Sequence, residues 1–488
     1  MESTITQLTV KPAVDFSSLR AGLVGDVVVP GDLGWDEARQ AWNLAVDQQP
    51  AAVALPDTAA DVAAIVDFAR AHGLRVAPQG TGHNAPPLGL MADTILVKTH
   101  RMRGVEVHPE ARTVRVEAGV LWLEVVTAAA EHGLAALAGS SPDVGVVGYS
   151  LGGGISWLAR KHGLSANSVT AVEIVTADGR LVRTDSDHEP ELFWAVRGGG
   201  GNFGIVTALE LRLYPIEEVY AGILFWPIER SGEILQAWRR WIEDVPEEVT
   251  SVGRILQLPP IPEIPEPLRG RSFVIVEAIM LLEEAAGADL LRPLRELGPE
   301  IDTVATIPAA ALSHLHMDPE QPVPGAGDGM LLADLTPETI AAIVEAAGPD
   351  SGSPLISVEV RHLGGALARS APHHGAIATI DAPFVMFAVG ITPTPEAHAA
   401  VEAHVRQVRS ALASWDAGKA YLNFTERKVD PQIFYRDETY RRLRKVKSIY
   451  DPSELFKANH QIPPAEAHRP RRSKRVAPPP ARSLPSRR

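Results

Sequence analysis

The chain of 488 residues contains no cysteine. Disulfide bonds, thiolate nucleophiles, iron–sulfur clusters and cysteine zinc sites are therefore excluded together. Long hydrophobic runs are missing as well, because charges or glycines interrupt every apolar stretch before the roughly 18 residues that a membrane span requires. The first residues lack the basic-then-apolar pattern of a secretory signal. We therefore expect a soluble, unexported protein of the cytoplasm with no membrane partner.

Basic residues are scarce outside the C-terminal end. The formal net charge is −14, from 46 Lys and Arg against 60 Asp and Glu. Eight of the basic residues lie within 469–488, which holds no acid, so the rest of the chain carries 38 basic and 60 acidic residues, a net charge of −22. An acidic body argues against nucleic acid as a partner. The tail, residues 466–488, is proline-rich without apolar periodicity and is predicted to be disordered.

The pattern of elements changes at Pro215. Before it, short strands, short helices and glycine clusters follow one another, and after it long strands alternate with helices between proline-rich breaks. The second pattern predicts one antiparallel sheet with helices on one face, an α+β unit. We expect helices at 36–46, 58–72, 121–132, 155–162, 191–196, 232–245, 285–297, 337–347, 395–413 and 439–450, and strands at 53–55, 74–77, 94–98, 104–108, 113–117, 169–176, 179–184, 205–214, 272–282, 355–362 and 377–389.

A glycine–histidine turn, Gln79–Asn84, follows the predicted strand 74–77. Between this strand and the preceding one, apolar residues recur at i, i+3, i+4 and i+7, which predicts a helix capped by Asp57 or Thr58. Such a strand–helix–strand unit places the turn at the carboxyl end of a strand, where ligands bind in α/β units. Its glycines allow close backbone approach to a ligand, and its N–H groups could form an anion-binding concavity. An ordinary turn with an exposed histidine is the alternative.

Three short motifs suggest other chemistries. Residues 199–204 fit the dinucleotide pattern G-x-G-x-x-G, but a helical segment precedes them and a strand follows, the reverse of the required order. Residues 80–85 fit a variant of this pattern, but two prolines stand where its helix should begin. Residues 148–152 fit the G-x-S-x-G elbow of α/β-hydrolases, with Ser150 as the nucleophile. Because Asp381 and His460 could complete a triad, a serine hydrolase remains an alternative.

No metal site is predicted. The two close histidine pairs, at positions 314/316 and 373/374, lack the i, i+4 helical spacing and the nearby carboxylate ligand of a metal centre. Histidines in such segments are expected to be solvated loop residues.

Eight short motifs, each occurring once, follow one another along the chain. They are Gln79–Asn84, Ser141–Val146, Leu151–Gly154, Lys161–Leu164, Glu191–Gly198, Gly201–Thr207, Tyr421–Asn423 and Tyr450–Asn459. Together they resemble the berberine-bridge-enzyme-like flavin oxidoreductases of the vanillyl-alcohol-oxidase (PCMH-type) superfamily, over roughly residues 35 to 465. The stretch Arg361–Ala366 is similar to the bacterial branch, which includes 6-hydroxy-D-nicotine oxidase and sugar oxidases.

This resemblance implies an FAD-binding domain of the PCMH type, formed by residues 36–215 and 417–465. A substrate-binding domain at 216–416 would be inserted between them, and residues 1–35 would be an N-terminal extension. The resemblance also implies that His83 is bonded through a ring nitrogen to the 8α-methyl group of FAD. Ser141 stands where many relatives carry a cysteine linked to flavin C6, so attachment through histidine alone is expected.

The cofactor is expected to lie against the glycine clusters. Backbone N–H groups would hold its pyrophosphate, and the strand end at 204–206 would meet its adenine side. The expected cofactor-binding residues are Gly80, Thr81, Gly82, His83, Asn84, Ser140, Ser141, Pro142, Val144, Gly145, Gly148, Gly152, Gly153, Gly154, Gly204, Val206 and Asn459.

The implied reaction is hydride transfer from a substrate C–H to flavin N5, with removal of a proton from an adjacent O–H or N–H. Tyr421 is expected to act as the base or to polarise the substrate, and Asn423 to position the ring or the substrate. A packed core tyrosine is the alternative for Tyr421. The substrate would be a small molecule, namely an alcohol, a sugar or a cyclic amine. Molecular oxygen is the expected electron acceptor, with a dehydrogenase that uses another acceptor as the alternative.

The predicted strand 355–362 offers a second set of side chains. A period of two places Ser357, Glu359 and Arg361 on one face and apolar residues on the other. The polar face could form the floor of the active site, where Glu359 or Arg361 would contact the substrate. A solvated sheet face is the alternative.

Overall fold

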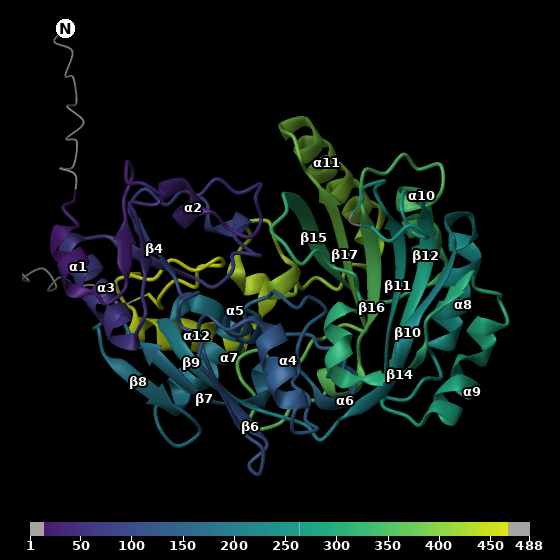
Figure 1. Ribbon diagram of the computed structural model, residues 1–488, viewed down its shortest axis with the longest axis horizontal. Coiled ribbons are helices and arrows are strands. Elements are labelled where there is room, and N and C mark those ends of the chain that lie inside the picture. Colours follow the sequence, from purple (N-terminus) through teal and green to yellow (C-terminus); the bar gives the residue numbers. More distant parts are fainter. Residues whose placement is uncertain (1–13, 263, 467–488) are drawn as a thin grey trace, which may run out of the picture.

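The computed structural model describes residues 14–262 and 264–466, arranged around three β-sheets (Figure 1). Two smaller sheets lie together with the C-terminal segment, and a large sheet lies on the other side of the molecule. Residues 467–488, which include most of the tail predicted to be disordered, lie outside the described residues.

The first sheet carries the glycine–histidine turn. Its order is β1-β2-β4-β3, in which β2 and β3 run parallel to β4 and β1 runs antiparallel to β2. Helix α3 connects β2 to β3 and is capped at its N-terminus by Thr58, whose side chain accepts a hydrogen bond from the backbone N–H of Asp61. The elements are α1 (Ser17–Gly22), β1 (Asp26–Val28), α2 (Trp35–Arg39), β2 (Ala52–Leu55), α3 (Ala59–His72), β3 (Arg75–Gln79) and β4 (Thr94–Lys98).

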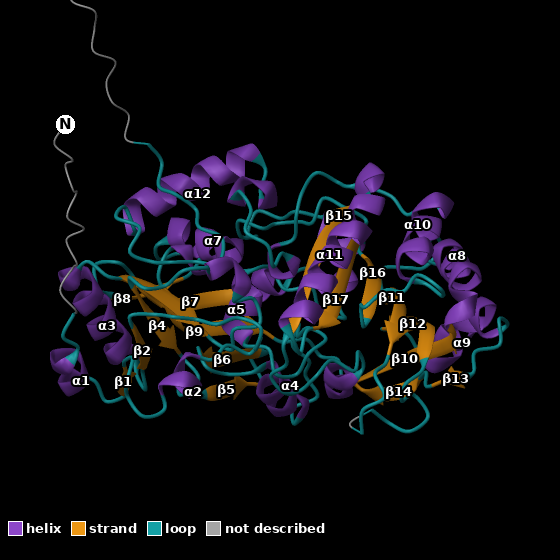
Figure 2. Cartoon of the chain, turned by 90° about the horizontal axis from the view of Figure 1, so that it is seen from above, coloured by secondary structure: helices purple, strands orange, loops and turns teal. Residues whose placement is uncertain are grey.

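The second sheet is antiparallel throughout, in the order β5-β6-β9-β7-β8. Helix α12 of the C-terminal segment packs on α7 (Figure 2), so the chain returns to this body after the large sheet. The elements are β5 (Val105–His108), β6 (Thr113–Glu117), α4 (Trp122–Ala130), α5 (Val146–Leu151), α6 (Ala159–His162), β7 (Val169–Val175), β8 (Leu181–Thr184), α7 (Pro190–Gly199), β9 (Ile205–Arg212) and α12 (Asp437–Tyr450).

The third sheet has the order β13-β10-β12-β11-β16-β17-β15, with β14 paired to β10, and all its pairs are antiparallel. Helices α8, α9, α10 and α11 cover one face of it (Figure 2), and their apolar side chains form a core cluster with those of the strands. The predicted α+β fold is thereby confirmed. The elements are β10 (Glu218–Pro227), α8 (Ser231–Trp241), β11 (Val249–Gln257), β12 (Ser272–Met280), α9 (Glu284–Arg295), β13 (Ile301–Asp302), β14 (Ala305–Pro308), β15 (Gly325–Leu332), α10 (Pro337–Ala347), β16 (Ser357–His362), β17 (Phe384–Ile391) and α11 (Pro395–Ala411).

Short 3₁₀ turns connect these elements and stand beside several of the glycine clusters. One of them replaces the helix that a dinucleotide site would need after the glycine–histidine turn, as the two prolines predict. They are η1 (Pro86–Leu88), η2 (Ser165–Ser168), η3 (Gly200–Asn202), η4 (Ile228–Arg230), η5 (Ala309–His314), η6 (Gly365–Ala368), η7 (Ala413–Trp415), η8 (Leu422–Phe424) and η9 (Pro431–Phe434).

Some predicted elements were wrong in extent. The helix expected at 36–46 ends at Arg39, because Gln40 adopts extended dihedrals and the chain then turns inward. The helix expected at 155–162 begins only at Ala159, and α5 lies inside the glycine cluster instead. The strand expected at 377–389 begins only at Phe384, and strands β1, β10, β11, β13, β14 and β15 were missed. Three glycines in β15 weaken its strand pattern, since a glycine offers no side chain to pack.

Candidate active site

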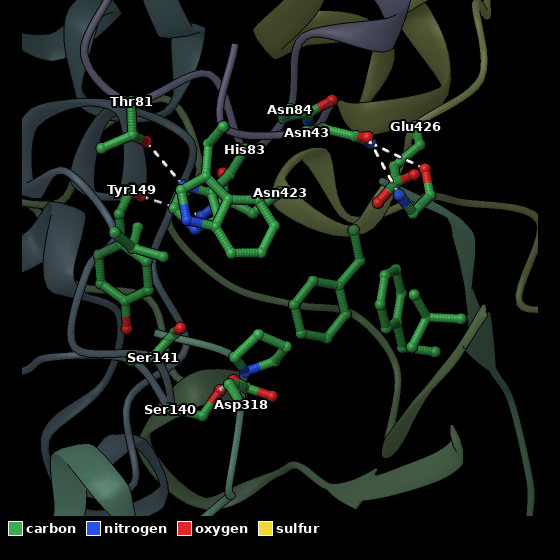
Figure 3. A pocket seen from close by; sticks show the side chains of 18 of the residues that line it. Asn43, Thr81, His83, Asn84, Ser140, Ser141, Tyr149, Asp318, Asn423 and Glu426 are labelled. Atoms are coloured by element: carbon green, nitrogen blue, oxygen red, sulfur yellow. Dashed lines mark hydrogen bonds between the residues drawn. The ribbon is translucent and has the colours of Figure 1, made fainter. Parts of the chain in front are cut away.

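A cavity of about 1580 Å³ lies between the glycine clusters and the uncovered face of the large sheet (Figure 3). Pockets for single drug-sized ligands usually measure about 300–1,000 Å³, so this cavity has room for a large cofactor beside a substrate. Turns after β3 and before α5 form one wall. The opposite wall consists of side chains from β11, β16 and β17.

Most of the residues predicted to bind the cofactor line this cavity. Three of them do not reach its wall. Pro142 is buried beside it, while Gly153 and Gly154 lie behind it and make room for the rings of Tyr421 and Tyr149. Those that line the cavity are Gly80, Thr81, Gly82, His83, Asn84, Ser140, Ser141, Val144, Gly145, Gly148, Gly152, Gly204, Val206 and Asn459.

Gly82 is the position in the turn that requires glycine. Its φ of +93° lies in the left-handed region, which side chains with a β-carbon rarely adopt. A β-carbon at this place would also lie 2.9 Å from Nε2 of Gln79 and 3.0 Å from the β-carbon of Ala41. The turn is therefore fixed both by its backbone conformation and by its packing, and this directs His83 into the cavity.

Three neighbours hold the ring of His83. Its Nδ1 lies 2.7 Å from the hydroxyl oxygen of Thr81, and the indole of Trp42 stacks on it with ring centres 4.0 Å apart. Its buried Nε2 faces Oδ1 of Asp143 at 3.4 Å and has no closer polar partner among the described residues. Trp42 was expected in a helix and Asp143 was given no role from the sequence. They lie 101 residues apart and meet only in the fold.

Tyr421 lies at the centre of a group of hydrogen-bond donors. Its hydroxyl oxygen accepts bonds from the backbone N–H of Gly154 at 2.9 Å, from that of Ile155 at 3.1 Å and from the amide Nδ2 of Asn423 at 3.2 Å. Burial raises the pKa of Tyr421 well above its ordinary value, although these donors and Arg361 act in the opposite direction. The hydroxyl is therefore protonated at neutral pH and is surrounded by groups that would stabilise a negative charge on its oxygen.

Tyr149 is a second tyrosine in the cavity wall, and sequence reasoning gave it no role. Its buried hydroxyl has no hydrogen-bond partner among the described residues. Burial, together with the nearby Tyr421, raises its pKa far above the ordinary value. The only sequence signal was its place inside a glycine cluster.

Glu359 and Arg361 are both buried in the cavity wall on β16. Nε of Arg361 donates to Oε1 of Glu359 at 2.7 Å, and the guanidinium lies 5.0 Å from the ring centre of Phe424. The other carboxylate oxygen of Glu359 is 2.7 Å from Nε2 of His316. Burial alone would raise the pKa of Glu359, but Arg361 and His316 hold it far below its ordinary value. The alternative of a solvated sheet face does not apply here.

His316 is not the solvated loop residue that the sequence suggested. It is buried, and its Nδ1 lies 2.8 Å from Oε1 of Glu277 while its Nε2 contacts Glu359. Burial and Arg254 lower its pKa, but Glu277, Asp318 and Glu359 together raise it to about 9. His316 is therefore charged at neutral pH and bridges two buried carboxylates beneath the cavity.

Glu426 is a further residue that the sequence did not single out. It lines the cavity near Asn43 and Asn84 (Figure 3), and its Oε2 accepts a hydrogen bond from the backbone N–H of Gly327 at 2.9 Å. Burial raises the pKa of this carboxyl to about 8. It is therefore largely neutral at pH 7 and able to donate a hydrogen bond into the cavity.

The hydrolase alternative has no triad in residues 14–262 and 264–466. Ser150 is buried, and its hydroxyl oxygen lies 3.1 Å from that of Ser165. Asp381 pairs with Arg436, and Nε2 of His460 lies 3.2 Å from the carbonyl oxygen of Thr425. The three residues therefore serve separate contacts rather than one catalytic unit.

Two further findings concern the part of the chain that the structure describes. It contains no group of three or more His, Asp or Glu side chains placed to hold a metal ion. None of its helices has both the length and the hydrophobicity to cross a membrane.

Comparison with known families agrees with this arrangement. Residues 50–185 match the FAD binding domain family, and residues 420–463 match the berberine and berberine like family. The chain is therefore an FAD-linked oxidoreductase similar to the berberine-bridge-enzyme-like proteins, which confirms the resemblance noted from the sequence.

Individual relatives are distant but extend over most of the chain. It is 27% identical over 461 residues to (R)-6-hydroxynicotine oxidase of Paenarthrobacter nicotinovorans, which covers 90% of this chain and 97% of that enzyme. It is 26% identical over 468 residues to xylooligosaccharide oxidase of Thermothelomyces thermophilus, covering 88% and 91%. The solved structure of wild-type BBE-like 1 from Physcomitrella patens covers 93% of this chain and 100% of that one, with a TM-score of 0.80 and 20% identity, and supports the fold.

The cavity fits an FAD by its chemistry. Glycines at positions 80, 82, 145 and 148 leave backbone exposed along one wall. Apart from Nε2 of His83, which faces Asp143, four buried polar atoms in the wall have no hydrogen-bond partner within the described residues, and a bound cofactor would supply partners for them. They are Nε2 of Gln79, Oδ1 of Asn84, the hydroxyl of Tyr149 and Nδ1 of His460.

Proposed function

We propose that this protein oxidises an alcohol, a sugar or a cyclic amine, using FAD attached covalently through His83 alone. The observation that carries the proposal is the position of His83, whose ring points into the cavity beside glycines that allow close approach. The absence of cysteine leaves no thiol for a second attachment. Bound FAD supplies a two-electron acceptor that takes a hydride from a substrate carbon.

The catalytic roles are assigned to Tyr421 and Asn423, which pack against the glycine cluster before α6, and to Glu359 and Arg361 on the wall formed by the large sheet. Tyr421 in its ionised form takes the proton of the substrate O–H or N–H. The three N–H groups around its oxygen stabilise the negative charge that it carries before the transfer, and the transfer leaves a neutral hydroxyl. Asn423 fixes that oxygen through one of these bonds. Arg361, oriented by Glu359, lies in the cavity wall, where its guanidinium can contact the substrate.

Molecular oxygen is the proposed electron acceptor, with hydrogen peroxide as its product. Relatives that extend over most of the chain carry the name oxidase, which supports this choice. We also propose that residues 36–215 and 417–465 form the FAD-binding part and residues 216–416 the substrate-binding part. The placement of the eight-stranded sheet within 216–416 supports this division.

Acid precipitation of the purified protein tests the attachment. The wild-type protein should be yellow and should keep its flavin in the denatured pellet, whereas His83→Ala should release all of it. The exposed His132 offers a matched control, and His132→Ala should retain the flavin. A wild-type protein whose flavin stays entirely in the acid supernatant would refute covalent attachment.

Substrate and acceptor require separate measurements. Sugars, cyclic amines and aromatic alcohols can be scored anaerobically for bleaching of the flavin absorbance, which reports reduction by substrate alone. Admission of oxygen should then restore the colour and release one hydrogen peroxide per flavin. Bleaching without reoxidation by oxygen would indicate a dehydrogenase with another acceptor.

A further inference from the structure

The carboxylate of Asp143 faces the ring of His83 and is held in place by two other side chains. The hydroxyl of Ser141 donates to its Oδ1 at 3.1 Å, and the indole N–H of Trp42 donates to its Oδ2. The same Trp42 stacks on His83, and its backbone N–H donates to the carbonyl oxygen of Thr81 at 2.9 Å. Segments around positions 42, 81 and 141 therefore fix one carboxylate against one imidazole.

The chemistry of these contacts determines which ring nitrogen carries the hydrogen. A carboxylate can only accept, so the nitrogen that faces Asp143, Nε2, carries the N–H. In a neutral imidazole the other nitrogen then has the free lone pair, and the hydroxyl of Thr81 is placed to donate to it. Nδ1 of His83 is thereby the nucleophilic nitrogen.

The charge of Asp143 supports the same conclusion. Burial raises the pKa of its carboxyl, but the contacts with His83, Trp42 and Ser141 lower it by more than burial raises it. The pKa of Asp143 is therefore below its ordinary value. The carboxylate is therefore ionised at neutral pH. A negative charge beside Nε2 favours the positive charge that the imidazole acquires when Nδ1 forms a bond.

We propose that Asp143 is the positioning residue for flavin attachment: it holds Nε2–H of His83 so that Nδ1 attacks the 8α-carbon of the flavin. This inference rests on the single-histidine attachment proposed above. In the reaction a bond forms between Nδ1 and the 8α-carbon, one methyl C–H and the imidazole N–H are lost, and two electrons reduce the flavin ring. Dioxygen then reoxidises the ring, giving one hydrogen peroxide for each attachment.

A purely structural role for Asp143 makes a different prediction. If the carboxylate only joined the segments around positions 42 and 141, its loss would weaken FAD binding or the stability of the fold. The attachment rate at saturating FAD would then be unchanged. The rate of attachment and the affinity for FAD must therefore be measured separately.

The test uses full-length protein produced under riboflavin depletion and then mixed with FAD. Flavin retained after acid precipitation gives the attachment rate, and fluorescence quenching of added FAD gives the dissociation constant. At saturating FAD, Asp143→Asn should attach at least about tenfold more slowly than wild type, with a dissociation constant within about threefold. Asp187 is exposed, and the matched Asp187→Asn control should behave as wild type.

Asp143→Ala provides a second variant with a distinct readout. Added formate can supply a carboxylate in the space left by the side chain, so its attachment rate should rise with formate concentration, whereas that of Asp187→Asn should not. Thermal unfolding of each variant checks that the fold is intact.

Two results would overturn the proposal in distinguishable ways. Attachment by Asp143→Asn at the wild-type rate, or an Asp143→Ala rate that formate leaves unchanged, would remove the role of Asp143 and leave the histidyl attachment standing. Complete release of flavin by acid from the wild-type protein would remove both proposals.

Discussion

Gly152 and Asn423 are in direct contact, because the amide oxygen of Asn423 occupies the space that a β-carbon at Gly152 would need. Nδ2 of the same amide donates to the carbonyl oxygen of Tyr149 at 3.0 Å and to the hydroxyl of Tyr421. This contact joins the glycine cluster before α6 to the chain that returns after the large sheet. The position of Tyr421 in the cavity therefore depends on a missing side chain 269 residues earlier in the chain.

Gly152→Ala should displace Asn423 and thereby the Tyr421 hydroxyl. The backbone at Gly152, with φ −88° and ψ 0°, tolerates alanine, so the effect comes from the contact alone. We expect kcat to fall at least about tenfold, with a loss of about 1–3 kcal/mol in the free energy of unfolding from overpacking. In the double variant with Asn423→Ala the two losses should be less than additive. Gly232→Ala, where a β-carbon meets open space, is the control.

Tyr421→Phe should lower kcat by a factor of about 10²–10⁴, the usual contribution of a general base. Because burial raises the pKa of Tyr421, the wild-type rate should keep increasing with pH beyond the ordinary tyrosine value of about 10. The variant should lose this increase while it retains its flavin. Steady-state kinetics from pH 6 to 10.5 measure both effects, and an unchanged pH profile in Tyr421→Phe would assign the proton to another residue.

His316 should make the stability of the protein depend on pH. Its folded pKa of about 9 lies above the unfolded value of about 6.5. Its stabilising contribution is therefore complete below pH 6.5 and is lost as pH rises through 9, by about 3 kcal/mol in total. Urea unfolding should show that His316→Gln destabilises the protein much more at pH 6 than at pH 9.5. The exposed His132→Gln should show no such difference.

Asp451→Asn should strongly destabilise the C-terminal return. Lys447 and Asp451 are fully buried partners, and Asp451 also accepts the backbone N–H groups of Leu455 and Phe456. Removal of one member of a buried ion pair costs about 3–5 kcal/mol, because the remaining charge stays in the interior. The exposed pair of Arg442 and Glu191 is the control, since Glu191→Gln should cost less than about 1 kcal/mol in chemical unfolding.

Local patterns predicted the parts of the fold that local interactions decide. The helix after Thr58 has the expected cap, and the apolar stripe from Val62 to Ala69 is fully buried. Strands β4 and β6 have the predicted bounds. The pattern was insufficient at β15, where glycines hide a strand, and at residues 40–46, where a bend and a turn replace the helix that the composition suggested.

The sequence by itself determined the resemblance to FAD-linked oxidoreductases, through glycine clusters in a fixed order, and it determined that no thiol is available for the flavin. Only the tertiary structure decided which side chains surround the candidate site. Trp42 and Asp143 meet at His83 from distant segments, and His316 enters from a loop to bridge Glu277 and Glu359. Sequence periodicity reports which face of an element is buried, whereas the charge and orientation of a buried polar group depend on partners that folding brings together.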